Sequence, residues 1–183
     1  FIDSCEIFNN DSIGINYTMQ YGHHKIRNSK IYGNGIGIYQ ETGCNNEYGD
    51  NYIEYNSIYN NTIAGIFYNK PFNTTEKNDS EIVVFNDFYN NAEDIIINIA
   101  LQFRINDNNF PGLGTTYDYL TADTFSINFE SNYWGVQAIE EMNQKGDNAN
   151  ISFFRDFYDD FELGKIIYSK WHTSPVENAG ANW

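Results

Sequence analysis

The sequence predicts an all-β protein in which short strands wind into a parallel β-solenoid. Three stretches are near copies of one another: NSKIYGNGIGIYQ at 28–40, NSIYNNTIAGIFYN at 56–69 and FNDFYNNAEDIIIN at 85–98. One apolar position of the repeat falls at Ile7, Ile31, Ile58 and Phe88, with spacings of 24, 27 and 30 residues. Helical repeats usually run longer, and their apolar residues follow a helical spacing that is absent here. Coils of strands stacked on one another fit both the length and the β-branched composition.

Aligning the copies on these apolar anchors reveals further columns of like residues. Five residues before the anchor stand Ile2, Ile26, Ile53 and Val83, and three residues after it stand Asn10, Asn34, Asn61 and Asn91. A second polar column, two residues before the anchor, contains Cys5, Ser29, Asn56 and Asn86. In a solenoid each column stacks from coil to coil about 4.8 Å apart. We therefore expect Ile31, Ile58 and Phe88 to point inward, and the asparagines to align at corners as hydrogen-bonded ladders.

The 183 residues are predicted to form a single domain, with coils over about 1–100. Residues 104–125 (RINDNNFPGLGTTYDYLTADTF) are too long and too rich in Gly and Asn for a corner, and predict an excursion. Residues 126–183 predict a closing coil and cap, with one short helix at 136–145 (VQAIEEMNQK). Because Phe1 begins inside a coil, with no start methionine or leader, we expect a segment or mature form of a longer protein.

The charge balance argues against several partners. Asp and Glu outnumber Lys and Arg by 25 to 10, which gives a net charge of −15. Such a surface repels nucleic acid, and no apolar run is long enough for a membrane span. The adjacent His23 and His24 lack partner ligands, so we predict no metal site and no cofactor. Calcium stays open, because carboxylate and carbonyl oxygens can bind it.

Cysteines and glycosylation sequons bear on the compartment. The sequence Asn-X-Ser/Thr occurs at Asn10, Asn16, Asn60, Asn73, Asn78 and Asn150, which favours export, although 28 asparagines produce some of these matches by composition. Cys5 and Cys44 fall in unrelated parts of their coils. We predict two free thiols, with Cys5 buried.

The pattern N-x-I-Y-N-N-x-x-x-G-I, read at 56–66, resembles the right-handed parallel β-helix repeat of pectin-lyase-like enzymes, carbohydrate epimerases and many bacterial and archaeal surface proteins. The closing NYWG at 132–135 and YDDFELGKIIYSKW at 158–171 look like the end of such surface proteins. The resemblance implies a right-handed parallel β-helix whose carboxyl end is capped. It specifies no activity, because one fold hosts many functions.

An enzymatic site has weak candidates in the loop ETGCNNEYGDN at 41–51. Glu41, Glu47 and Asp50 could meet across coils as the carboxylate pair that glycoside hydrolysis requires. Lyases and epimerases of the resembled type would add a basic residue or calcium. With 25 acidic residues in an exposed solenoid, a solvated acidic face is the simpler interpretation.

The residue after the anchor forms an aromatic column that predicts a ligand-binding surface. It reads Phe8, Tyr32, Tyr59 and Tyr89, with Trp134 added from the closing motif. Because neighbouring strand residues point to opposite faces, this column should point outward. An outward aromatic column either binds a ligand or is covered, by the excursion or by another subunit. If it binds, a glycan running along the axis is expected to stack successive sugar faces on successive rings.

Together these features predict a secreted or cell-surface module that recognises carbohydrate, with a polysaccharide or cell-surface glycan as partner. One alternative is a polysaccharide lyase, glycoside hydrolase or epimerase of the pectin-lyase-like type. A second alternative is a structural subunit of a filament or coat, for which self-association would be the sign.

Overall fold

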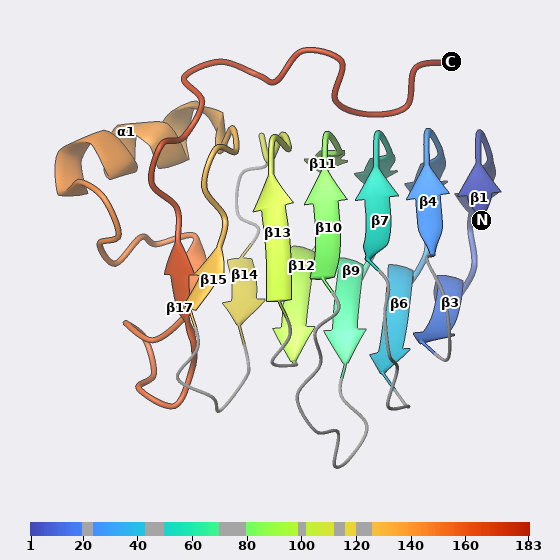
Figure 1. Ribbon diagram of the computed structural model, residues 1–183, viewed down its shortest axis with the longest axis horizontal. Coiled ribbons are helices and arrows are strands. Elements are labelled where there is room, and N and C mark those ends of the chain that lie inside the picture. The colour runs from blue at the N-terminus through green and yellow to red at the C-terminus, as the bar shows by residue number, and fades with distance from the viewer. Residues whose placement is uncertain (20–23, 43–49, 70–79, 99–101, 112–115, 120–125) are drawn as a thin grey trace.

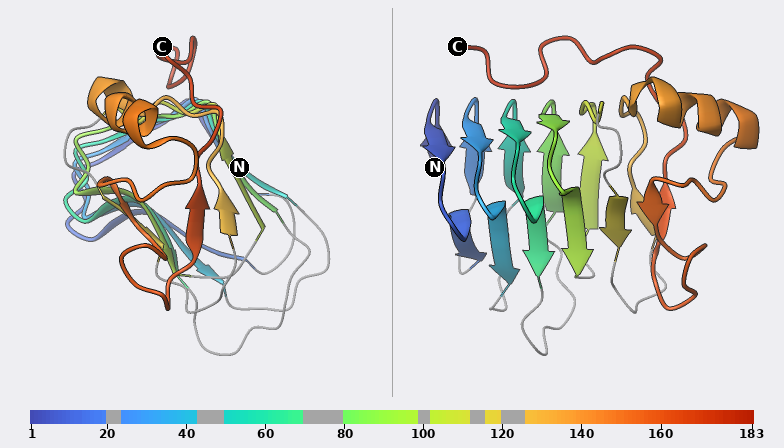
Figure 2. Two further views of the ribbon diagram at one scale, coloured as in Figure 1. Left: turned by 90° about the vertical axis from the view of Figure 1, so that its left-hand side faces the viewer. Right: turned by 180° about the vertical axis from the view of Figure 1, so that it is seen from behind.

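A computed structural model describes residues 1–19, 24–42, 50–69, 80–98, 102–111, 116–119 and 126–183. The described chain is mostly strands, and every pairing between them is parallel. The strands form three sheets that wind into a parallel β-solenoid, as the sequence predicts (Figure 1). Seen along the axis, the coils superpose and the closing strands lie across one end (Figure 2).

Each sheet collects one strand from successive coils. Sheet A contains β1 (Ile2–Asp3), β4 (Lys25–Arg27), β7 (Asn51–Glu54), β10 (Ser80–Val84), β13 (Gln102–Asn106), β15 (Ser126–Asn128) and β17 (Lys165–Ile167). Sheet B contains β2 (Glu6–Phe8), β5 (Lys30–Tyr32), β8 (Ser57–Tyr59) and β11 (Asp87–Tyr89). Sheet C contains β3 (Ile13–Met19), β6 (Ile36–Thr42), β9 (Ala64–Asn69), β12 (Glu93–Asn98), β14 (Thr116–Tyr119) and β16 (Phe154–Arg155).

Left-handed backbone angles turn the chain on both sides of sheet B. Before the strand, positive φ occurs at Ser4, Asn28, Tyr55 and Phe85, and Asp107 and Ser131 repeat it before the bridges that continue the sheet; after the strand it occurs at Asn9, Gly33, Asn60 and Asn90. Asn and Gly reach this region at modest cost, which explains why they occupy all four positions after the strand. Tyr55 and Phe85 are less suited to it, and their parallel rings stack 5.1 Å apart. That contact offsets part of the backbone strain.

The interior is filled by the predicted columns. Ile31, Ile58 and Phe88 are fully buried and in register, which confirms the predicted inward stack. The same column continues through Phe110 and Trp134, whose rings follow Phe88 at centroid distances of 4.9 Å each. Trp134 is therefore an interior residue, 3% exposed, and its predicted place in the outward column is wrong.

Both asparagine ladders are present. Nδ2 of Asn34 donates to Oδ1 of Asn61 at 3.1 Å, and Nδ2 of Asn61 donates to Oδ1 of Asn91 at 2.8 Å. The second ladder runs through Asn56, Asn86, Asn108 and Asn132, with Oδ1 to Nδ2 distances of 3.0, 3.0 and 3.1 Å. Each accepting Oδ1 also accepts the backbone N–H of the asparagine in the preceding coil. These buried N–H groups therefore have hydrogen-bond partners where water is excluded.

The expected excursion at 104–125 is, over its described part, another coil. β13 pairs with β10 and β15, Asn108 joins the second asparagine ladder, and β14 pairs with β12 and β16. The reason is visible in the side chains: Ile105, Asn108 and Phe110 carry the same spacing as Val83, Asn86 and Phe88, and all are buried. The repeat thus extends beyond residue 100.

The carboxyl end closes the solenoid and then turns back. Helix α1 (Gly135–Lys145) confirms the predicted helix and buries Ala138, Ile139 and Met142. Beyond β17, a segment that we call the tail, residues 172–183, runs along the upper edge towards the N-terminal end (Figure 1). Among the described residues no helix is long and apolar enough to cross a membrane.

Cys5 differs from its prediction. Its thiol is free as expected, but the residue is exposed in the first described coil rather than buried. Cys44 lies outside the described residues.

Candidate functional site

The outer face of sheet B carries the predicted aromatic column. Each strand of this sheet has three residues, and its middle residue points inward. The third residue therefore points outward, and supplies Phe8, Tyr32, Tyr59 and Tyr89, which we call the aromatic ladder. The strands are in register at these positions, so the ladder follows the solenoid axis.

The rings of the ladder stack on one another. Successive centroids lie 5.2, 4.8 and 4.6 Å apart, and successive planes are within 5°, 6° and 9° of parallel. Parallel rings at such distances overlap in an offset stack, because rings side by side in one plane need more room. The ring faces inside the ladder are thus occupied by neighbouring rings. The expectation that sugar faces stack on these inner rings is accordingly wrong, and ring edges and hydroxyl groups are what the ladder presents.

The hydroxyl groups of Tyr59 and Tyr89 are held in the protonated form. Burial is the main cause that raises the pKa of Tyr59, and it raises the pKa of Tyr89 to about 12. Tyr32, Tyr59 and Tyr89 are all partly exposed, whereas Phe8 at the N-terminal end is 47% exposed. The ladder therefore offers a row of hydroxyls with one exposed ring at its end.

The tail lies beside the ladder. It contacts the residues two positions before the ladder rings: the backbone N–H of Ala181 donates to Oγ of Ser57 at 3.0 Å. Asn109 lies in the same column and forms two hydrogen bonds with the backbone of Val176. Its Oδ1 accepts from the N–H of Val176 at 2.7 Å, and its Nδ2 donates to the carbonyl of Val176 at 3.2 Å. The tail forms one rim of the face and leaves the ladder rings themselves partly exposed.

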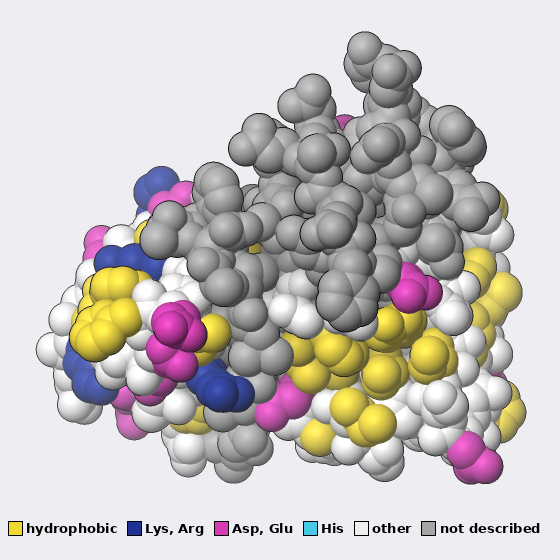
Figure 3. Space-filling model, turned by 90° about the horizontal axis from the view of Figure 1, so that it is seen from below, with side chains coloured by type: hydrophobic (Ala, Val, Ile, Leu, Met, Phe, Trp, Pro, Cys, Tyr) yellow, Lys and Arg dark blue, Asp and Glu magenta, His cyan; other side chains and the backbone are white. Residues whose placement is uncertain are grey.

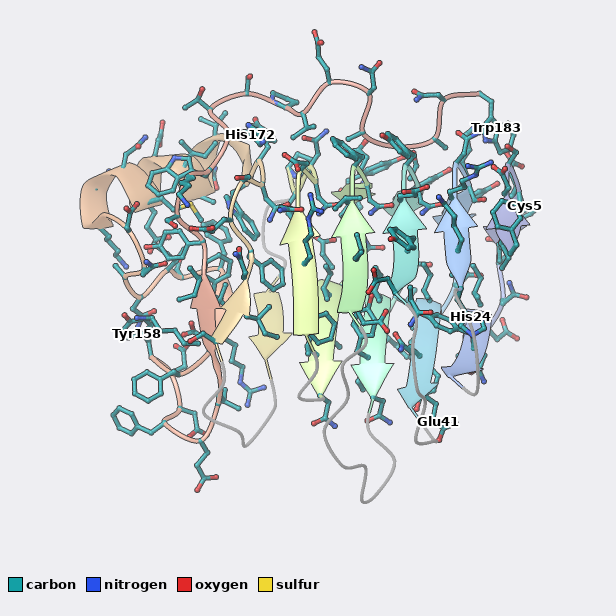
Figure 4. All side chains as sticks on the ribbon, viewed as in Figure 1. Cys5, His24, Glu41, Tyr158, His172 and Trp183 are labelled. Atoms are coloured by element: carbon teal, nitrogen blue, oxygen red, sulfur yellow. The ribbon has the colours of Figure 1, made fainter. Side chains whose placement is uncertain are left out.

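Trp183 adds an aromatic ring that sequence reasoning missed. Its Nε1–H donates to the carbonyl of Asn28 at 2.6 Å, and Nζ of Lys30 lies 4.2 Å from its ring centroid. Half of the residue is exposed at 51%, and Figure 4 shows it at the N-terminal end of the upper edge. It lies next to the strand that carries Tyr32. No local pattern could reveal this contact, since the partners are 155 residues apart.

The charges around the ladder are sparse. Lys30 and Glu6 form a loose ion pair at 3.9 Å. Asp87 is half-buried near Gly180 of the tail, and burial raises the pKa of its carboxyl group while a hydrogen bond from Asn109 lowers it. The face is thus a mixture of hydroxyl, amide and aromatic groups rather than a cluster of charges.

A shallow hollow of 310 Å³ opens at the corner after Phe8 and Tyr32. Its wall includes Asn9, Asn34 and Thr62, and also Gly33, which stands where other coils carry Asn60 and Asn90. A Cβ at Gly33 would come within 2.6 Å of Oδ1 of Asn9. The hollow offers amide and hydroxyl groups to a small polar ligand.

The candidate acids stay a prediction. Glu41 is at the end of β6 in sheet C, at the opposite edge from the tail (Figure 4). Asp50 immediately precedes β7 in sheet A and accepts a 3.5 Å hydrogen bond from the hydroxyl of Tyr52. Glu47 lies outside the described residues. Within the described ranges no group of three or more His, Cys, Asp and Glu side chains could hold a metal ion.

A buried carboxylate inside the solenoid has a structural role. Oε1 of Glu81 accepts from Nδ2 of Asn51 at 2.8 Å and from Nε2 of Gln40 at 2.9 Å. Gln40 in turn accepts from the hydroxyl of Tyr17 at 2.9 Å. A buried carboxylate is tolerable only with such partners, and the network ties strands of sheets A and C together.

Sheet C also carries apolar side chains on its outer face. The rings of Tyr39 and Phe67 meet edge to face with centroids 5.6 Å apart, and Ile96 follows Phe67 in register. Hydrophobic side chains gather on the face seen from below (Figure 3). This patch lacks the regular stacked arrangement of the ladder, which makes sheet B the better candidate for an extended ligand.

No protein-family model, no curated protein and no solved structure matches the chain.

Proposed function

We propose that this protein is an exported or surface-displayed β-helix module that recognises a neutral polysaccharide or cell-surface glycan through the outer face of sheet B. The observation that carries the proposal is the ladder: Tyr32, Tyr59 and Tyr89 repeat one hydroxyl per coil along the axis. A repeated ligand is the natural match for a repeated surface.

The ladder spacing suits an extended glycan. Its ring centroids are 4.6 to 5.2 Å apart, which is close to the length of one sugar unit in an extended chain. A glycan lying along the axis meets one tyrosine hydroxyl per unit, and these hydroxyls hydrogen-bond with sugar hydroxyls. Phe8 and Trp183, each about half exposed, are the rings with room for a sugar face. Recognition thus combines hydrogen bonds along the ladder with stacking near its N-terminal end.

The charge of the protein restricts the class of glycan. With a net charge of −15, the surface repels uronates and sulfated sugars. Lys30 is the cation of the ladder strands, and Glu6 and the ring of Trp183 already engage it. The proposal therefore specifies an uncharged glycan.

Display outside the cell is supported by sequence features and their placement. The repeat and the closing NYWG motif resemble surface proteins of the pectin-lyase-like superfold. The sequon residues Asn60 and Asn150 are exposed, as glycosylation requires.

Removing only the hydroxyls tests the proposal without disturbing the stack. The triple variant Tyr32→Phe, Tyr59→Phe, Tyr89→Phe keeps every ring, and Tyr52→Phe on β7 of sheet A is the matched control. A glycan array identifies a ligand for the wild type, and calorimetry then compares the variants. We expect the triple variant to bind about tenfold more weakly or worse, and the control to bind normally. Equal affinity of a folded triple variant would place the site elsewhere.

A further inference from the structure

The ladder column continues past Tyr89 without rings. Parallel bridges join Asp87 to Asn109 and Asn109 to Tyr133, so the positions that follow Tyr89 are Pro111 and Gly135. The interior column beneath them keeps its aromatic residues, Phe110 and Trp134. In these two coils the inward residue is therefore still aromatic, whereas the outward residue carries no aromatic ring.

A pocket of 260 Å³ occupies this end of the ladder. Its wall includes Pro111, Trp134, Val136 and Phe153. Gln137, Tyr133 and Trp134 are the lining residues whose side chains carry hydrogen-bonding groups, and Gln137 is the exposed one. Gly135 has φ of 76°, and a Cβ there would lie 3.3 Å from the backbone of Pro111. A glycine is thus suited both to the turn into α1 and to the close approach of Pro111, and it leaves the pocket open.

We propose that this pocket binds the acetamido group of an N-acetylhexosamine unit in the glycan that lies on the ladder. The inference rests on the proposed function, because the ladder aligns the chain whose end reaches the pocket. A methyl group suits walls of Pro, Val and aromatic carbon, and the amide can exchange a hydrogen bond with Gln137. The group is uncharged, which agrees with the strongly acidic surface.

The geometry sets the minimum length of the ligand. Gly135 lies two coils beyond Tyr89, which is about 10 Å at the spacing of parallel strands. From Phe8 the column spans five spacings, or about 24 Å. A glycan of six units therefore covers the ladder and the pocket together, and shorter oligomers engage only one of them.

Two oligosaccharides that differ in the acetamido group test the inference. The probes are the β-1,4-linked hexamer of N-acetylglucosamine and the β-1,4-linked hexamer of glucose, and the affinity of each is measured by calorimetry. The wild type is expected to prefer the acetylated hexamer about tenfold, since a buried methyl group and one hydrogen bond supply a difference of that order.

A variant that fills the pocket separates this inference from the proposed function. Val136 is 65% exposed, so Val136→Trp can fill the pocket without entering the core, and Asn143→Trp on the exposed side of α1 is the control. We expect Val136→Trp to abolish the preference for the acetylated hexamer, and Asn143→Trp to behave as wild type. Equal binding of both hexamers by the wild type, or a preference that survives Val136→Trp, overturns the pocket while the ladder stands. If the wild type binds neither hexamer, the pocket assignment and the ladder as a binding site for these glycans are both overturned.

Discussion

Asn61 donates a hydrogen bond from Nδ2 to Oδ1 of Asn91, 2.8 Å away in the neighbouring coil and 30 positions later in the sequence. Its own Oδ1 accepts both the backbone N–H and the Nδ2 of Asn34, each at 3.1 Å. The residue is 1% exposed, so water cannot replace these bonds. The asparagine ladders therefore hold the coils in register, and this register is what aligns the tyrosines on the neighbouring face.

Replacing Asn61 by Ala should destabilise the solenoid strongly. The change leaves the buried backbone N–H of Asn34 without its acceptor, which costs about 1–3 kcal/mol. It also removes the side-chain hydrogen bonds to Asn34 and to Asn91, each worth about 0.5–1.5 kcal/mol. We expect the free energy of unfolding, measured with urea, to fall by about 3 kcal/mol or more.

Asn10→Ala is the matched control in the same column. Asn10 is exposed at the N-terminal end of the first asparagine ladder. Its Nδ2 donates to Oδ1 of Asn34, and among the described residues no other asparagine donates to it. Its loss should cost less than about 1 kcal/mol, because water can satisfy the freed groups. Equal losses for the two variants would contradict the structural role of the interior ladder.

Cys5 should react in the native protein. The thiol is free and exposed in the first coil, and Sγ contacts only the carbonyl of Asp3 among its described hydrogen bonds. Mixing the folded protein with a chromogenic disulfide should label one equivalent at Cys5 without denaturant, as peptide mapping can verify. Labelling of Cys5 only after unfolding would mean that another chain or segment covers the first coil.

Stability should decline in alkali. Burial raises the pKa of Tyr89 to about 12, and raises those of Tyr17 and Tyr68 well above their ordinary value of 10.0. A tyrosine whose pKa is higher in the folded state than in the unfolded state stabilises the fold, and this stabilisation is complete below pH 10. It is lost as the pH rises from 10 through the pKa of the folded state. The melting temperature should therefore fall from about pH 10 upward. A melting temperature that stays constant to pH 12 would show that these tyrosines ionise freely in the fold.

Much of the fold could be predicted because the stacked coils of a solenoid repeat the same residue types at fixed positions in the sequence. Ile31, Ile58 and Asn61 recur at fixed offsets, and like residues must meet when coils superpose. The coil to which the described part of 104–125 belongs was missed because Pro111 and the following glycine resemble loop chemistry. Its signal was nevertheless present in the shared spacing of Ile105, Asn108 and Phe110. Counting two residues beyond Asn132 likewise places Trp134 in the interior.

The details of the candidate site depend on information that periodicity does not contain. The offsets predict that Tyr32 and Tyr59 share a column, but the side-chain torsions decide whether the rings offer faces or edges. Trp183 reaches Asn28 only because the chain returns along the whole solenoid after β17. Such a return follows from tertiary packing of the tail and has no local signature.

The most direct test of the central claim is to observe the ladder tyrosines while a glycan binds. Protein labelled with ¹³C in the tyrosine rings gives separate NMR signals for Tyr32, Tyr59 and Tyr89, assigned with the single Tyr→Phe variants, and Tyr52 on sheet A serves as an internal reference. On titration with the ligand found by the array, we predict progressive shifts of the three ladder signals and a constant signal for Tyr52. A glycan that binds while the ladder signals stay unchanged would contradict the assignment of this face.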